Sequence, residues 1–240
     1  MVYDILTKIF LFKNRYKLTL LKKCLFCESE IKFFFSSISD LKKITLVQCT
    51  KCNIVFQNPR LSDDSLDQFY ENKYRKNFGS TEYSKLFSRE QRRGKYIFEF
   101  VKEFLLKRCE ILEIGCGTGG ILKTFKDKNH YVEGLEIDKN AVNFSKTKGI
   151  NTKFGGIDLC KKKYDLVILS HVFEHIAYPK EFLLKLKNIV KKGGIVYVEV
   201  PGIENPAVKN KNYATQLGHL IYYNERTLSK LFFNFKFKNL

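Results

Sequence analysis

A turn built on alternating glycines carries the clearest chemical signal in this chain. Residues 111–120 read ILEIGCGTGG, an apolar run with one acid, Glu113, followed by Gly115, Gly117 and Gly119. Glycine at alternate positions lets the backbone turn sharply and approach a ligand without a Cβ atom in the way. A helical pattern follows directly, and a strand, a glycine turn and a helix N-terminus together predict a cofactor cradle at the carboxyl edge of a parallel sheet. The spacing G-x-G-x-G differs from the G-x-G-x-x-G of dinucleotide sites, and a tight turn without a ligand is the alternative.

The glycine spacing and the preceding acid resemble motif I of class I S-adenosylmethionine-dependent methyltransferases. S-adenosylmethionine brings a sulfonium, an ammonium and a carboxylate, whereas a dinucleotide brings a pyrophosphate that favours bare N–H groups. The resemblance implies that the three glycines cradle the methionine part of the cofactor and that Glu113 balances its positive charge. It also implies that Glu136, at the end of the next predicted strand, accepts hydrogen bonds from the ribose hydroxyls. The remaining residues assigned to cofactor binding are Ile137 along the adenine, Asp158 where relatives often carry an adenine-contacting acid, and Ser170 at a strand end.

A histidine-rich segment, SHVFEH at residues 170–175, is predicted to end a strand at the same edge of the sheet. It holds two of the chain's four histidines, His171 and His175. Histidine titrates near neutral pH and can take a proton from an attacking hydroxyl. Methyl transfer is a displacement at a carbon that the cofactor has already activated, so the protein supplies alignment, desolvation and, for a hydroxyl, a base. The alternative is that Glu174 and His175 cap the next helix and shape the cofactor pocket.

The same segment, followed by IAYP, resembles many small-molecule and glycan methyltransferases. It argues against methylation of nucleic-acid bases, because amino-group methyltransferases of that kind carry Asn/Asp-Pro-Pro-Tyr/Phe at this place. Enzymes that methylate C5 of pyrimidines use a Pro-Cys nucleophile, and the chain has neither motif. Further along, GHLIYY at residues 218–223 resembles the substrate-side lid of the same family, which implies that His219 is a base or a substrate contact. Packing within a loop is the alternative for His219.

Four of the seven cysteines form two C-x-x-C pairs, namely Cys24, Cys27, Cys49 and Cys52. Each pair places two thiolates on one turn, and two such turns complete a tetrahedral four-sulfur zinc site with no ligand position left for catalytic water. The separation of the pairs slightly exceeds the common range, which a longer hairpin would absorb. A structural zinc ion would also explain how so short a segment folds. Unligated or disulfide-bonded pairs and a redox-active pair are the alternatives.

The chain is strongly basic, with 43 Lys and Arg against 25 Asp and Glu and a formal net charge of +18. The excess is spread along the chain instead of forming a stripe, which favours solvated surface, with an attraction to polyanions as the alternative. No uncharged apolar run approaches the roughly 20 residues of a membrane span. The apolar stretch at residues 9–12 is too short for a signal peptide, and scattered single cysteines indicate a reducing compartment. We therefore expect a cytoplasmic protein.

Strands and helices alternate from residue 109 onward, which predicts a doubly wound, mostly parallel α/β fold. A preceding long helix is predicted over 82–106, with a buried stripe at three-to-four spacing. The stripe consists of Tyr96, Ile97, Phe100, Val101, Phe104 and Leu105. The predicted strands are 109–114, 131–137, 164–170 and 195–200; the predicted helices are 120–128, 140–148 and 179–191, the last ended by Gly193 and Gly194.

The predicted organisation has four parts along the chain. They are a basic lead-in at 1–23, a zinc-ribbon-like module at 24–60, connecting helices at 61–106 and an S-adenosylmethionine-binding methyltransferase domain at 107–240. Within the module, residues 31–35 and 44–48 are expected to form strands. At the far end, residues 225–233 read as a helix and 235–240 as one strand. Class I methyltransferases end in an antiparallel hairpin of two strands, so the final C-terminal strand is expected to be missing.

The order of these parts resembles a set of bacterial methyltransferases associated with sugar and surface-polysaccharide biosynthesis. In both, a zinc-ribbon-like module is followed by N-P-R, here residues 58–60, by a Ser-capped acidic helix and by an aromatic pair, Phe69 and Tyr70. The resemblance implies an enzyme that methylates a small-molecule, sugar-derived acceptor, with His171, His175 and His219 on the acceptor side. Two other hypotheses remain. One is an RNA methyltransferase whose module and positive charge attract the phosphate backbone, and the other is a non-catalytic, cofactor-binding assembly protein.

Overall fold

The computed structural model describes residues 2–13, 15–39, 42–72, 79–204 and 217–238. The chain divides into two compact units. The cysteine unit comprises Met1–Phe69, Glu174–Leu183 and Val200–Leu240, and the sheet unit comprises Tyr70–Phe173 and Leu184–Glu199. Among the described residues, none of the helices combines the length and the apolar character that crossing a membrane requires.

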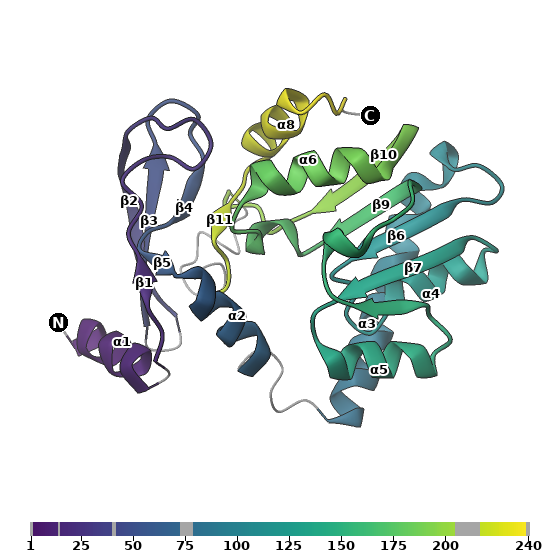
Figure 1. Cartoon of the computed structure of the whole chain (residues 1–240), viewed down its shortest axis with the longest axis horizontal. Coiled ribbons are helices and arrows are strands. Elements are labelled where there is room, and N and C mark those ends of the chain that lie inside the picture. Colours follow the sequence, from purple (N-terminus) through teal and green to yellow (C-terminus); the bar gives the residue numbers. More distant parts are fainter. Residues whose placement is uncertain (1, 14, 40–41, 73–78, 205–216, 239–240) are drawn as a thin grey trace. The chain divides into compact units, whose positions relative to one another are not determined.

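A five-stranded parallel sheet with the order β10-β9-β6-β7-β8 forms the sheet unit (Figure 1). Parallel strands are covered on both faces, so they read as apolar runs, and residues 166–169 of the chain are fully buried. The predicted α/β fold is therefore confirmed. The strands are β6 (Glu110–Ile114), β7 (Tyr131–Glu136), β8 (Thr152–Phe154), β9 (Tyr164–Ser170) and β10 (Val190–Glu199). The helices are α3 (Ser80–Val101), α4 (Gly120–Asp127) and α5 (Lys139–Thr147). Helix α6 (Pro179–Ile189), whose residues up to Leu183 belong to the cysteine unit, leads into β10.

Two elements of the sheet unit differ from the sequence-based expectation. The three-residue strand β8 was not predicted, because so short a run has no measurable periodicity. Helix α6 ends at Ile189, and the glycines expected to terminate it lie inside β10. Gly193 has a φ of +79°, and the pairing of β10 with β9 shifts between Val190 and Ile195. The glycines therefore form an irregularity in a strand, not a helix cap.

The buried stripe on α3 is narrower than predicted. Ile97 and Val101 are 1% and 2% exposed and pack in the core of the sheet unit, whereas Tyr96 and Phe100 are 79% and 70% exposed. The two pairs lie on adjacent rows of the helix, and only one row faces the core. The α-helix ends at Val101, and a short 3-10 helix over Lys102–Phe104 carries Phe104 to the surface.

An antiparallel sheet with the order β11-β4-β3-β2 lies at the centre of the cysteine unit. The long hairpin of β2 (Ile31–Ser39) and β3 (Lys42–Cys49) confirms the two strands predicted there. Strand β4 (Val55–Gln57) joins this hairpin to β11 (Ile221–Tyr222), where Ile221 pairs with Phe56. A late segment of the chain thus completes a sheet that the early residues begin. The remaining elements are α1 (Val2–Lys13), the pair β1 (Leu18–Thr19) and β5 (Arg60–Leu61), and α2 (Asp63–Asn72).

Helix α8 (Glu225–Asn234) confirms the last predicted helix and begins at Asn224, whose side chain accepts a hydrogen bond from the Thr227 N–H at 2.8 Å. The strand predicted over 235–240 is wrong for residues 235–238, while residues 239 and 240 lie outside the described part. The chain reverses at Lys236, with a φ of +70°, and the Phe237 ring packs on Phe232 at 5.6 Å between centroids. These residues therefore end the helix instead of forming a strand. Among the described residues of the sheet unit, no antiparallel strand follows β10.

Candidate cofactor site and acceptor-side residues

The glycine turn connects the carboxyl end of β6 to α4. Gly115, Gly117 and Gly119 have φ values of +69°, +55° and +81°, a backbone region that favours glycine. A Cβ atom on Gly115 would lie only 2.4 Å from Cγ2 of Val172, the second residue after β9. The Gly115 N–H also donates to the carbonyl oxygen of Leu135 in β7 at 2.8 Å. The turn is therefore fixed between the ends of β7 and β9, at the edge where parallel sheets bind ligands.

Glu113 precedes the turn and is almost completely buried, with 1% of its surface exposed. Its Oε2 atom has no hydrogen-bond partner among the described residues. Burial, followed by the charges of Glu90 and Glu136, raises the pKa of this carboxyl well above its ordinary value. A buried acceptor oxygen under these conditions fits a ligand that brings positive charge. The residues present thus fit the cofactor that the motif resemblance implies.

Glu136 ends β7 and binds backbone N–H groups through both of its oxygens. Oε2 accepts from Gly117 at 2.7 Å, and Oε1 accepts from Ile137 and Asp138 at 2.7 and 2.9 Å. A carboxylate has about four lone-pair sites, so Glu136 keeps acceptor capacity for a ribose hydroxyl while it holds the turn.

A third carboxylate, Glu90 of α3, also binds the turn and was missed by the sequence analysis. Its Oε2 accepts hydrogen bonds from the N–H groups of Thr118 and Gly120, both at 3.1 Å, and from the Thr118 hydroxyl. These N–H groups lie at the start of α4, where a negative charge is favourable. Glu90 sits among other charged residues on a long helix, so no spacing in the sequence connects it to the glycines.

The other residues predicted to bind the cofactor differ in their exposure to solvent. Ile137 is half exposed at the end of β7, as an adenine-lining residue would be. Asp158 lies in a short 3-10 helix (Ile157–Leu159), and its carboxylate forms a surface ion pair with Lys185 at 2.6 Å. Ser170 is buried, and its hydroxyl donates to Glu199 at 3.0 Å. The Ser170 hydroxyl therefore already donates its proton to a hydrogen bond within the protein.

His171 follows β9 directly and contacts Glu199, which ends the neighbouring strand β10. Its φ of +55° is unusual for a residue with a side chain and costs on the order of 1–3 kcal/mol. The His171 N–H donates to the Glu199 carbonyl oxygen at 2.8 Å, and Nε2 lies 3.7 Å from Glu199 Oε1. Arg93 of α3 lies 3.8 Å from the other carboxylate oxygen. Hydrogen bonding to His171, together with Arg93 and against the effect of burial, lowers the pKa of Glu199.

Glu199 was not predicted, because strand patterns give no register between β9 and β10. The structure pairs it with Ser170 across the two strands. The His171–Glu199 pair therefore belongs to the carboxyl edge of the sheet, one residue away from the Val172 that contacts the glycine turn.

The other two candidate histidines belong to the cysteine unit and lie together there. His175 and His219 have ring centroids 4.7 Å apart in a T-shaped arrangement. His175 Nδ1 lies 2.8 Å from the Gly218 carbonyl oxygen, and its Nε2 lies 3.9 Å from Glu174 Oε1. Glu174 and His219 are buried, and His175 is partly exposed.

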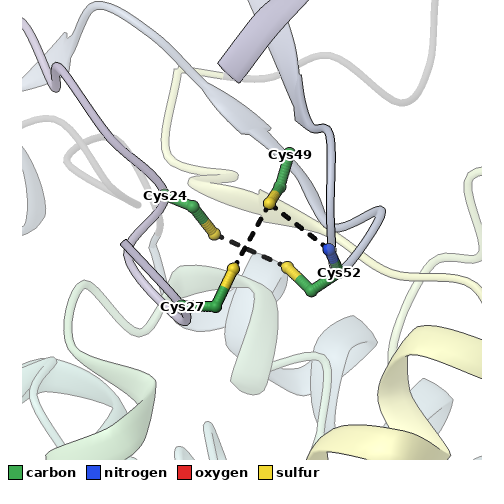
Figure 2. Close-up of side chains that lie close together, drawn as sticks. All are labelled: Cys24, Cys27, Cys49 and Cys52. Carbon is green, nitrogen blue, oxygen red and sulfur yellow. Dashed lines mark hydrogen bonds between the residues drawn. The ribbon is translucent and has the colours of Figure 1, made fainter. Parts of the chain in front are cut away.

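The four paired cysteines converge in space (Figure 2). The Sγ atoms of Cys24 and Cys52 are 3.5 Å apart, those of Cys27 and Cys49 are 3.4 Å apart, and all are free thiols. Zinc–sulfur bonds of about 2.3 Å in a tetrahedron place sulfur atoms about 3.8 Å apart. The backbone N–H of Phe26 also points at Cys24 Sγ, at 3.4 Å. The donor set and its spacing thus fit one structural zinc ion.

The pKa values of Cys24 and Cys27 depart from the ordinary thiol value in opposite directions. Burial raises the pKa of Cys24 to about 11. Burial also tends to raise the pKa of Cys27, but hydrogen bonds from Ser29 and the neighbouring thiols outweigh this effect and lower the pKa to about 6. Metal binding requires all ligands as thiolates and releases the remaining protons.

Comparisons with solved structures agree with the fold. An S-adenosylmethionine-dependent methyltransferase of Thermotoga maritima superimposes with a TM-score of 0.55 at 18% identity, covering 72% of this chain and 82% of its own. One from Archaeoglobus fulgidus gives 0.54 at 21% identity, covering 71% and 74%. At these identities the likeness establishes the fold alone.

Sequence relatives and a family model indicate the family to which the chain belongs. An uncharacterised protein of Methanocaldococcus jannaschii is 30% identical over 92 residues, 37% of this chain and 43% of that protein. The ubiquinone biosynthesis O-methyltransferase of Rickettsia canadensis is 28% identical over 116 residues, 44% and 49%. This chain thus spans less than half the length of these curated relatives. The model of a family described as "Methyltransferase domain" matches residues 55–240, most of the chain and all of the glycine turn, so the chain belongs to this family.

Proposed function

We propose that this chain binds S-adenosylmethionine and transfers its methyl group to a hydroxyl oxygen of a small molecule. The acceptor class we propose is a sugar-derived intermediate of surface-glycan biosynthesis, methylated in the cytoplasm. Family membership, the glycine turn and the unpartnered buried oxygen of Glu113 support the cofactor. When bound, the cofactor supplies a methyl group activated by its sulfonium, so the protein has to align the acceptor, exclude water and take up a proton.

The observation that carries the acceptor chemistry is the His171–Glu199 pair beside the glycine turn. A hydroxyl must lose its proton as it attacks, and a neutral imidazole accepts it. His171 Nε2 lies 3.7 Å from Glu199 Oε1, so this carboxylate stabilises the imidazolium that forms when His171 takes the proton. The relative from Rickettsia canadensis is named as an O-methyltransferase, which accords with a hydroxyl acceptor. His175 and His219 are further acceptor-side candidates.

The sugar class rests on two resemblances. The segment at residues 170–175 resembles small-molecule and glycan methyltransferases, and the order of module, acidic helix and methyltransferase domain resembles enzymes of polysaccharide biosynthesis. A structural zinc ion on the four cysteines belongs to the same proposal. It would stabilise the zinc-ribbon-like module without taking part in methyl transfer.

The test is methyl transfer from labelled S-adenosylmethionine to a panel of nucleotide sugars and glycosides. We expect label on an acceptor oxygen, and a loss of turnover of about 10²–10⁴-fold in His171→Gln with unchanged cofactor affinity. His130→Gln is the matched control, because His130 is buried against Phe125 in the same unit. Equal turnover in His171→Gln and the control would contradict the role of His171.

Two competing functions give distinct results in the same assay. The net charge of +18 makes RNA the second candidate acceptor. In that case label enters RNA, and binding weakens steeply as salt rises. A non-catalytic assembly protein would bind the cofactor and release no S-adenosylhomocysteine with any acceptor.

A further inference from the structure

A second cluster of metal-ligand side chains lies in the cysteine unit. Glu174 and His175 come from a short 3-10 helix over Phe173–His175, and His219 comes from the segment just before β11. One ligand atom from each of the three lies within 4.8 Å of the others. Glu174 is 2% exposed and His219 is 8% exposed. Two imidazoles and one carboxylate from segments far apart in the sequence are thus gathered at one largely buried point.

The geometry of His175 fits a metal ligand. Its Nδ1 atom lies 2.8 Å from the carbonyl oxygen of Gly218, which accepts hydrogen bonds only, so Nδ1 carries the proton. The lone pair is then on Nε2. Metal-binding histidines are commonly oriented by this hydrogen bond to a backbone carbonyl. Because Gly218 immediately precedes His219, the bond also ties the two ligand segments together.

The spacing of the ligand atoms is that of groups around an ion. His175 Nε2 and Glu174 Oε1 are 3.9 Å apart, too long for a hydrogen bond. Two ligands each about 2.1 Å from a tetrahedral metal ion lie about 3.4 Å apart. The ligand atoms, which all lie within 4.8 Å of one another, then have to approach by up to about 1.4 Å on binding.

We propose that Glu174, His175 and His219 bind one divalent ion of the zinc class. Two imidazole nitrogens and one carboxylate oxygen are the three-ligand set of open zinc sites, in which the fourth position takes water or substrate. Magnesium and calcium prefer all-oxygen sites, so this donor set selects against them. The site differs from the four-cysteine cluster, whose soft sulfur ligands leave no open position.

The open position can take a water molecule or an oxygen atom of a small molecule. An ion held by these three residues would lower the pKa of a hydroxyl coordinated at that position. In this arrangement His175 and His219 are metal ligands.

Cobalt substitution of the full chain tests the site, because the two clusters give different spectra. A tetrathiolate site shows a strong sulfur-to-cobalt charge-transfer band, whereas a nitrogen and oxygen site shows only weak ligand-field bands. We expect about two cobalt ions per chain by elemental analysis, given the two ligand sets. In His219→Ala and Glu174→Gln the count falls to about one, with the charge-transfer band unchanged.

The retained charge-transfer band shows that the cysteine unit of each variant is folded, and His130→Gln should keep both ions. One cobalt ion per chain in the unmodified protein, all of it on thiolates, would overturn the proposal. So would an unchanged count in His219→Ala. Failure of methyl transfer with every acceptor would defeat the proposed function while leaving this count to decide the site.

Discussion

Substitution of Gly115 by alanine tests the geometry of the glycine turn most sharply. The new Cβ would lie 2.4 Å from Val172 Cγ2, about 1 Å inside ordinary contact, at a φ of +69°. The left-handed backbone costs a residue with a side chain roughly 1–2 kcal/mol, and overpacking costs about 1–3 kcal/mol. We therefore expect Gly115→Ala to lose about 2–5 kcal/mol of unfolding free energy in urea, followed by circular dichroism. A displacement of this size beside the cofactor should also lower turnover about 10²-fold.

Gly193→Ala separates the backbone cost of a left-handed conformation from the steric cost of overpacking. Gly193 has a similar φ of +79°, but its Cβ would meet no atom within 4 Å. It should lose only the backbone part, about 1–2 kcal/mol. Adding Val172→Ala to Gly115→Ala should restore the steric part, seen as a favourable coupling energy in a double-mutant cycle. If Gly115→Ala costs no more than Gly193→Ala, or the cycle shows no coupling, the turn is not packed as described.

The remaining predictions concern carboxylates and cysteines. Glu136→Ala should weaken S-adenosylmethionine binding in a calorimetric titration while circular dichroism shows the sheet unit still folded; unchanged affinity would remove its ribose role. Glu113→Gln should weaken cofactor binding yet stabilise the apo protein at neutral and high pH, because the raised pKa of Glu113 means that stability is lost as the pH rises through it. The lowered pKa of Glu199 has the opposite sign: its contribution is present above the ordinary carboxyl pKa and lost as the pH falls through the folded value, so Glu199→Gln should flatten the acid side of the stability profile. Chelation of zinc, or Cys49→Ser, should unfold the cysteine unit in amide exchange without exposing the core of the sheet unit.

Local patterns were sufficient for most elements of the sheet unit, because buried parallel strands and amphipathic helices leave distinct periodicities. Sequence patterns failed where tertiary contacts decide which side chains are buried and where an element ends. Tyr96 and Phe100 read as core residues, but the core reaches only the row of Ile97 and Val101. Gly193 reads as a helix stop and lies within a strand.

The residues of the candidate site also fall into those that sequence patterns predicted and those that they did not. Glu113, Glu136 and the glycines follow from spacing within one continuous strand–turn–helix–strand segment, β6 to β7. Glu90 and Glu199 do not, because each reaches the site from an element whose register against the others appears only in three dimensions.

The most direct test of the central claim is the position of the label after reaction with methyl-labelled S-adenosylmethionine and a sugar-derived acceptor. The proposal predicts label on a hydroxyl oxygen of the small molecule, with turnover about 10²–10⁴-fold lower in His171→Gln while calorimetry shows unchanged cofactor affinity. Label in RNA, or full transfer by His171→Gln, would contradict it.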